Sequence, residues 1–92
     1  MVVALSSKVV AKSGTFSTPV GDDLVLFDPE QGAYYGSGMV GEQIWSLIAD
    51  EQEVRSICDS LLERFEVERQ TCEAQVLEFL GELNEHGLIH VA

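Results

Sequence analysis

The hydrophobic pattern of this chain changes its period near residue 40, and this change limits the folds that the chain can adopt. Before this point, β-branched and aromatic residues form short runs separated by turn residues. After it, apolar residues recur every three or four positions, which is the spacing of amphipathic helices. Strands followed by helices in one small chain predict an α+β fold.

The clearest strand signal is a predicted hairpin over residues 24–35. It begins with the apolar run at residues 24–27, which is typical of a strand covered on both faces. Pro29 and Gly32 then suit a turn, because proline fixes φ and glycine accepts positive φ. Residues 33–35 are therefore expected to return as the second strand.

Weaker strand signals lie on either side of this hairpin. Residues 8–12 form a short strand candidate, and residues 16–20 are either irregular or a second short strand. The apolar tail at residues 88–91 is either a last strand or a strap over the core. We therefore expect a small antiparallel sheet of about three strands.

Two helices are predicted directly after residue 40. The first is short and covers residues 41–49. The second has the most regular spacing in the chain, and Asp50 with Glu53 has the spacing of a capping box before it. Its apolar stripe consists of Val54, Ile57, Cys58, Leu61, Leu62 and Phe65.

A third helix is predicted to begin between residues 69 and 71 and to stop at Gly87, where glycine suits a C-terminal cap. Leu77 lies about 100° or more away from the main apolar stripe of this helix. It is therefore either a singly exposed leucine or part of a second contact surface. The main stripe consists of Cys72, Val76, Phe79, Leu80 and Leu83.

The composition excludes several classes of partner. The chain has 92 residues, and 16 acidic against 5 basic residues give a net charge of −11, which repels nucleic-acid phosphates. No apolar run approaches the ~18 residues of a membrane span, and the first residues lack the charged start of a signal peptide. We therefore expect one domain, residues 1–92, in the cytoplasm, binding neither membranes nor nucleic acids.

A small sheet with three helices predicts a winged-helix-like domain, an architecture common among DNA-binding proteins. The third helix, which is the usual recognition element, carries several acidic residues that oppose contact with a major groove. An interaction or regulatory domain of this architecture remains an alternative. The acidic residues of that helix are Glu73, Glu78, Glu82 and Glu85.

No catalytic, cofactor or metal site is predicted. His86 and His90 are four residues apart, but Gly87 ends the helix between them and removes the geometry of a helical metal pair. Cys58 and Cys72 occupy apolar helical positions, so we expect reduced thiols in the core. A chain of this size without an active-site pattern is expected to bind a partner rather than to catalyse a reaction.

The returning strand of the hairpin is the best candidate for a binding site. If residues 33–36 form a sheet edge, their unpaired N–H and C=O groups can accept an extended peptide as an added strand. Tyr34 and Tyr35 would place one ring on each face of this strand. Two interpretations stay open. Either one ring faces a guest peptide and the other packs on the helices, or both rings cover the core.

Four segments resemble the PqqD-like proteins in their order and spacing, and the resemblance runs from about residue 8 to residue 91. This family contains the recognition elements of ribosomally synthesised and post-translationally modified peptides (RiPPs). They are winged-helix-like domains that bind the leader peptides of the precursors. The segments are residues 24–28, residues 32–35, residues 40–45 and residues 76–89.

The resemblance implies that a leader peptide adds as an antiparallel strand to the third strand and lies in a groove between that strand and the third helix. Ser37 and Gly38 stand where many members have Leu-Asn, which implies a lost core anchor and a lost helix cap. The implied peptide-binding residues are Ala33, Tyr34, Tyr35 and Gly36 on the strand, and Cys72, Glu73, Val76, Leu77 and Leu80 on the helix.

The adjacent tyrosines and the Ile44-Trp45 pair are most similar to stand-alone members of lasso-peptide pathways. The resemblance thus implies a non-catalytic adaptor that presents the precursor to a cysteine-protease-type leader peptidase, with a lasso cyclase as a further candidate partner. An alternative is a PqqD-type peptide chaperone for a radical-SAM enzyme or another modifying enzyme.

Overall fold

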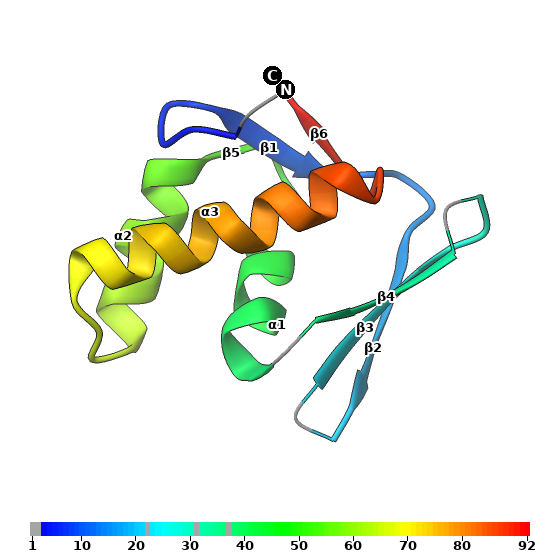
Figure 1. The fold of residues 1–92 in the computed structure, drawn as a ribbon, viewed down its shortest axis with the longest axis horizontal. Helices are drawn as coiled ribbons and strands as arrows, with labels where there is room; N and C mark the ends of the chain where they lie inside the picture. Colours follow the sequence, from blue (N-terminus) through cyan, green and yellow to red (C-terminus); the bar gives the residue numbers. More distant parts are fainter. Residues whose placement is uncertain (1–2, 22, 31, 37) are drawn as a thin grey trace.

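The computed structural model describes residues 3–21, 23–30, 32–36 and 38–92, and for residues 19, 20, 23, 33–36, 38 and 39 it describes the backbone alone. Strands come first and helices follow, which confirms the predicted α+β fold (Figure 1). The elements are β1 (Lys8–Ala11), β2 (Phe16–Val20), β3 (Asp23–Asp28), β4 (Gly32–Gly36), α1 (Gly38–Leu47), β5 (Gln52–Glu53), α2 (Val54–Arg64), α3 (Arg69–Glu85) and β6 (Ile89–Val91).

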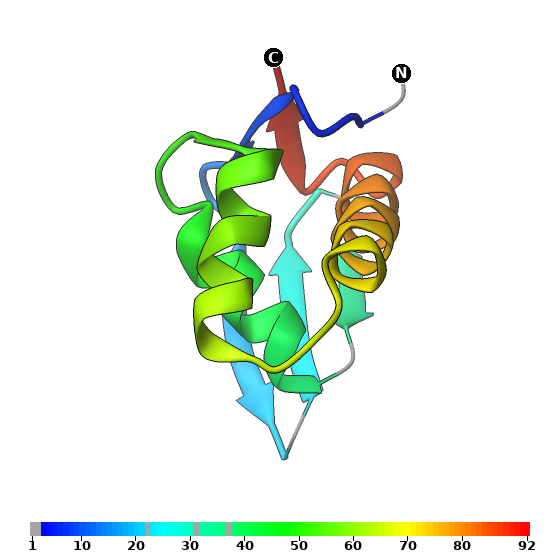
Figure 2. The same ribbon diagram turned by 90° about the vertical axis from the view of Figure 1, so that its left-hand side faces the viewer.

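The strands form two small antiparallel sheets rather than one. One sheet has the order β5-β1-β6, and the other has the order β2-β3-β4. β1, near the start of the chain, pairs with β6, near its end, and the two strands lie side by side in Figure 1. Figure 2 shows α1 in front of the β2-β3-β4 sheet, with α3 on the side where β4 lies. Among the described residues, no helix is long and apolar enough to cross a membrane.

The predicted hairpin is present as β3 and β4, and Gly32 at the turn has a φ of 89°. The expectation that β3 is covered on both faces is wrong. Leu24 and Leu26 are buried, whereas Phe27 is 50% exposed and pairs across the sheet with Phe16, which is 64% exposed. The reason is that α1 packs on one face of this antiparallel sheet and leaves the other face open.

The second helix is capped by the backbone and not by a side chain. The N–H of Val54 donates to the carbonyl of Ser7 at 2.9 Å, and the N–H of Arg55 donates to the carbonyl of Leu5 at 3.0 Å. Glu53 is the N-cap residue and makes no side-chain cap bond. The predicted capping box is therefore wrong, because the N-terminal segment satisfies these helix donors instead.

Helix α1 begins at Gly38 and ends at Leu47, earlier at both ends than the predicted range of 41–49. The lost core anchor inferred at Ser37 falls outside the described residues, and Gly38, where the lost cap was inferred, is the first residue of the helix. Ile48 follows the helix and is fully buried, so it belongs to the core.

Helix α3 spans Arg69–Glu85, as its periodicity predicts, and ends in a Schellman motif. Gly87 has a φ of 70° and donates its N–H to Asn84 O at 3.1 Å. Leu88 donates to Leu83 O at 2.9 Å, which completes the pair of bonds typical of this cap. The chain then reverses into β6, so the predicted C-terminal stop at Gly87 is confirmed.

A single hydrophobic core joins the three helices to both sheets. The second and third helices supply half of its buried residues, through the inward faces that the sequence predicts. The sheets contribute Val9, Leu24, Leu26 and Ile89. The helices contribute Ile44, Val54, Ile57, Cys58, Leu61, Cys72, Val76, Leu80 and Leu83.

Candidate functional site

Strand β4 forms an edge of its sheet within the described part of the chain. It pairs with β3 on one side, with Tyr34 opposite Leu26 and Tyr35 opposite Val25. Figures 1 and 2 both place β4 on the side of the sheet that is nearest to α3. An edge strand carries a row of N–H and C=O groups that can pair with another chain. The two interpretations of the tyrosine rings concern side chains outside the described part.

Helix α3 presents different residues on its two sides. Arg69 bonds to Asp59 of α2 at 2.9 Å and to Glu73 at 3.2 Å, so this side faces α2. Leu77 lies one turn beyond Glu73 on the same side. Phe79 is two residues from Leu77, about 200° around the helix, and therefore lies on the other side.

The opposite side of α3 faces α1. The Phe79 ring lies against Gly41 of α1, where an added β-carbon would be 3.5 Å from the ring. Gln75, one turn before Phe79, lies on the same side and is exposed. Since α1 follows β4 directly in the chain, this side of α3 borders the end of the edge strand.

The five helix residues that the resemblance implied fall into two groups. Cys72, Val76 and Leu80 are buried in the core, with exposed fractions of 3% or less. Glu73 and Leu77 are partly exposed on the side of the helix that carries the Arg69–Glu73 ion pair. Leu77 packs against the core cluster, which accounts for an apolar residue at this off-stripe position.

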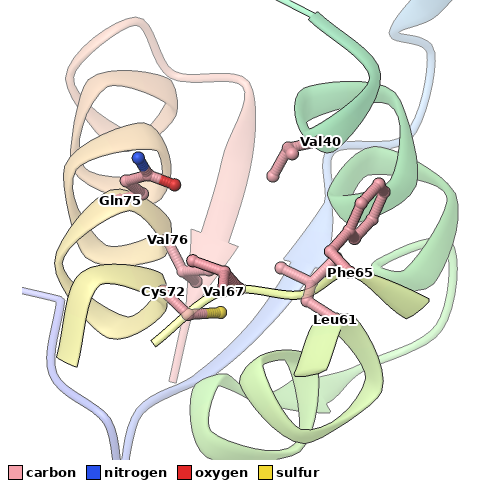
Figure 3. Close-up of a pocket in the computed structure, with 7 residues that line it drawn as sticks. All are labelled: Val40, Leu61, Phe65, Val67, Cys72, Gln75 and Val76. Carbon is pink, nitrogen blue, oxygen red and sulfur yellow. The ribbon is translucent and has the colours of Figure 1, made fainter. Parts of the chain in front are cut away.

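A pocket of about 120 Å³ opens where the three helices meet (Figure 3). Its floor is formed by Leu61, Cys72 and Val76, which are buried. Its rim is formed by residues that are partly or fully exposed, namely Val40, Phe65, Val67 and Gln75. The pocket is thus open to solvent and almost entirely apolar. It brings together Cys72 and Val76 from the predicted site residues.

The family model of coenzyme PQQ synthesis protein D (PqqD) matches residues 23–89, which cover most of the chain. The chain belongs to the PqqD family. This result confirms the resemblance drawn from the hairpin and the third helix. The matched range runs from the start of β3 through β4 and all three helices to β6.

A solved structure is also similar to this PqqD-family chain. It is the structure of TbiB1 in complex with the TbiA(beta) leader peptide, with 28% sequence identity and a TM-score of 0.74. The similarity covers 88% of this chain and 94% of that chain. No curated protein matched the sequence significantly.

Sequence reasoning did not assign Val40, Phe65, Gln75 or Phe79 to the candidate site of this PqqD-family protein. Phe65 and Phe79 belong to the apolar stripes that the sequence predicts, and Val40, Phe65 and Phe79 all pack against the core cluster. Gln75 carried no signal, because an exposed glutamine on a helix is common. These residues come together only where the helices meet, so periodicity within one helix does not reveal their proximity.

The two cysteines are free and buried, as predicted. Burial raises the pKa of the Cys58 thiol to about 11 and also raises the pKa of the Cys72 thiol. The Cys72 Sγ lies 4.0 Å from the Cys58 carbonyl oxygen. A raised pKa keeps a thiol protonated and weakens it as a nucleophile, so the geometry fits core thiols.

Proposed function

We propose that this chain is a non-catalytic adaptor that binds the leader of a ribosomally made precursor peptide by strand addition to β4. The observation that carries the proposal is the edge position of β4 beside α3 in a PqqD-family fold. The similarity to TbiB1, whose structure contains a leader peptide, supports the same function. Main-chain hydrogen bonds to the edge would fix the register of the leader, and side-chain contacts would give specificity.

The proposed contact residues on the strand are Ala33, Tyr34, Tyr35 and Gly36. On the helix, the geometry favours the side that carries Gln75 and Phe79, because that side faces α1 and the end of β4. Glu73 is less accessible to a peptide on this path, since it lies on the other side and pairs with Arg69. Buried Cys72, Val76 and Leu80 would support the helix from below and meet a guest only through the pocket.

Strand addition can be tested with leader peptides that carry single N-methyl groups. A methyl group on a backbone nitrogen removes one hydrogen-bond donor and leaves the side chains unchanged. Antiparallel pairing uses alternate residues of the added strand, so alternate N-methyl positions should weaken binding. The test measures affinity by calorimetry, using the synthetic leader of the precursor encoded beside this chain.

Two outcomes of that series decide between strand addition and other modes of binding. An alternating pattern of weak and normal affinity supports pairing with β4. Equal effects at every position, or no binding of the unmodified leader, would overturn the proposal. The unmodified leader is expected to bind with micromolar or tighter affinity.

The proposed role downstream of binding is delivery of the precursor to a cysteine-protease-type leader peptidase in a lasso-peptide pathway, with a lasso cyclase as a further partner. The proposal draws support from the similarity to TbiB1, whose structure contains a leader peptide. Reconstitution would test it. Purified peptidase should cleave the precursor faster when the adaptor is present, and an unchanged rate would argue against delivery.

The family description favours a second candidate function, since it names a protein of coenzyme PQQ synthesis. In that case the chain would present a peptide to a radical-SAM enzyme or another modifying enzyme instead. Co-purification distinguishes the two candidates. Stable association with a peptidase supports the first, and association with a radical-SAM enzyme supports the second.

A further inference from the structure

The apolar pocket at the meeting point of the three helices carries an inference that rests on the proposed function and adds a sequence requirement to it. We propose that this pocket receives one branched aliphatic side chain of the guest peptide. That side chain lies on the N-terminal side of the segment that pairs with β4. The proposal follows from the chemistry of the walls, the volume of the pocket and the direction of β4.

The walls favour an apolar guest. Leu61, Cys72 and Val76 form a buried floor without a charged group, and burial in this floor raises the pKa of the Cys72 thiol. Among the described lining residues, Gln75 is the only one with a polar side-chain amide, and it stands at the exposed rim. A charged side chain would lose its hydration here without gaining a partner, whereas an aliphatic one would leave water at no such cost.

The volume limits the size of the guest. At about 120 Å³, the pocket is somewhat smaller than a cavity of about 150 Å³ that holds a benzene molecule. Leucine, isoleucine or valine would therefore fit, and a tryptophan side chain would not. The open rim allows such a side chain to enter from outside, which a closed core cavity would not allow.

The direction of β4 decides which end of the peptide meets the pocket. β4 runs from Gly32 to Gly36 and leads into α1, where Val40 forms part of the rim in the first turns. A guest strand that runs antiparallel to β4 begins beside Gly36, at the α1 end. Since an extended chain advances about 3.3 Å per residue, the aliphatic residue should lie within a few positions before the paired segment.

The pocket can first be tested without any peptide. The probe is 3-methylbutan-1-ol, which carries a branched aliphatic group, titrated into methyl-labelled protein and followed by NMR. The methyl groups of Val40, Leu61, Val67 and Val76 should shift in a saturable manner, and Val9 in β1 should not. Uniform shifts, or none at the pocket, would overturn the assignment of an aliphatic site.

A matched pair of variants then connects the pocket to the leader. Val67→Phe fills the pocket from its partly exposed rim, while Val91→Phe makes the same change at a partly exposed position of β6, in the other sheet. Val67→Phe should weaken leader binding by about tenfold or more, and Val91→Phe by less than about twofold. Circular dichroism melts of both variants check that the fold is retained.

The outcomes separate this inference from the function on which it rests. Failure of the unaltered protein to bind the leader would overturn both together. Leader binding that Val67→Phe leaves unchanged would overturn the pocket assignment alone. Replacing the aliphatic leader residue with alanine should reproduce the loss seen with Val67→Phe, and should have little further effect in that variant.

Discussion

The carboxylate of Asp28 is buried and lies 3.1 Å from the Nζ of Lys12. The same carboxylate accepts the N–H of Glu30 at 2.7 Å and the hydroxyl of Thr15 at 3.3 Å. These contacts connect the turn between β3 and β4 with the segment that links the two sheets. A buried carboxylate therefore fixes the hairpin that presents the proposed binding edge.

Replacement of Asp28 with alanine should destabilise the protein by about 1–3 kcal/mol, because the N–H of Glu30 and the Thr15 hydroxyl lose their acceptor. Chemical denaturation measures the change. Glu30→Gln is the matched control, since the Glu30 side chain is 80% exposed and should affect the midpoint little. Equal midpoints for Asp28→Ala and the unaltered protein would show that the contacts contribute no stability.

The two glycines of α3 and its cap should respond in opposite directions to alanine. Gly81 lies within the helix with no atom within 4 Å of an added β-carbon, so Gly81→Ala should stabilise by about 0.5–1 kcal/mol. Gly87 has a φ of 70°, which strains any side chain, so Gly87→Ala should destabilise by about 1 kcal/mol or more. Thermal unfolding of both variants tests the pair, and changes of the same sign would contradict this account of the cap.

The N-terminus of α2 gives a prediction that separates the observed cap from the one expected from sequence. Asp50→Ala should change stability by less than about 0.5 kcal/mol, because no side chain caps this helix. Removal of residues 1–7 should instead destabilise the protein, since the carbonyls of Leu5 and Ser7 accept the first helix donors. If Asp50→Ala instead lowers the free energy of unfolding by about 1 kcal/mol or more, the result would support the capping box and contradict the backbone cap.

Alkaline pH should weaken the fold through Cys58. The folded protein raises the pKa of this thiol to about 11, so it holds the proton more tightly than the unfolded chain does. The free energy of unfolding should therefore be unaffected below about pH 9 and should fall as the pH approaches 11. Lys12 acts in the same direction, because its hydrogen bond to Asp28 raises the pKa of its ammonium group.

The contribution of Cys58 can be separated with a variant that does not titrate. Cys58→Ala should lower stability at neutral pH by leaving a small cavity, but its stability should decline less steeply between pH 9 and pH 11. In the native protein, Cys58 should also react slowly with iodoacetamide at pH 8. In denaturant, it should react as fast as an exposed thiol. Parallel pH profiles for the two proteins would contradict this role of Cys58.

Local sequence patterns are sufficient to predict the elements that depend on neighbouring residues alone. The second and third helices follow their apolar stripes closely, and the hairpin follows from Pro29 and Gly32. Strand β5 could not be predicted, because Gln52 and Glu53 become a strand only by pairing with residues 8 and 9. The cap of α2 has the same origin, since it depends on a segment that lies far away in the sequence.

Local patterns likewise predict one part of the candidate site, the edge strand, and do not predict the other part, the pocket. The edge strand was predictable from the turn that precedes it, because local residues determine a hairpin. The pocket was not, since Val40, Phe65 and Gln75 come from separate segments and meet only after the helices pack. The side chains of α3 that face α1 could be chosen only once the contact between Phe79 and Gly41 was known.

Hydrogen exchange of the β4 amides, measured with and without the cognate leader peptide, tests the central claim most directly. Strand addition predicts that alternate amides within residues 33–36 gain strong protection when the leader binds, because their N–H groups point away from β3 in the free protein. The amides of β6, at the edge of the other sheet, should stay unchanged. Leader binding that protects β6 or the helices, while β4 exchanges as before, would contradict the account.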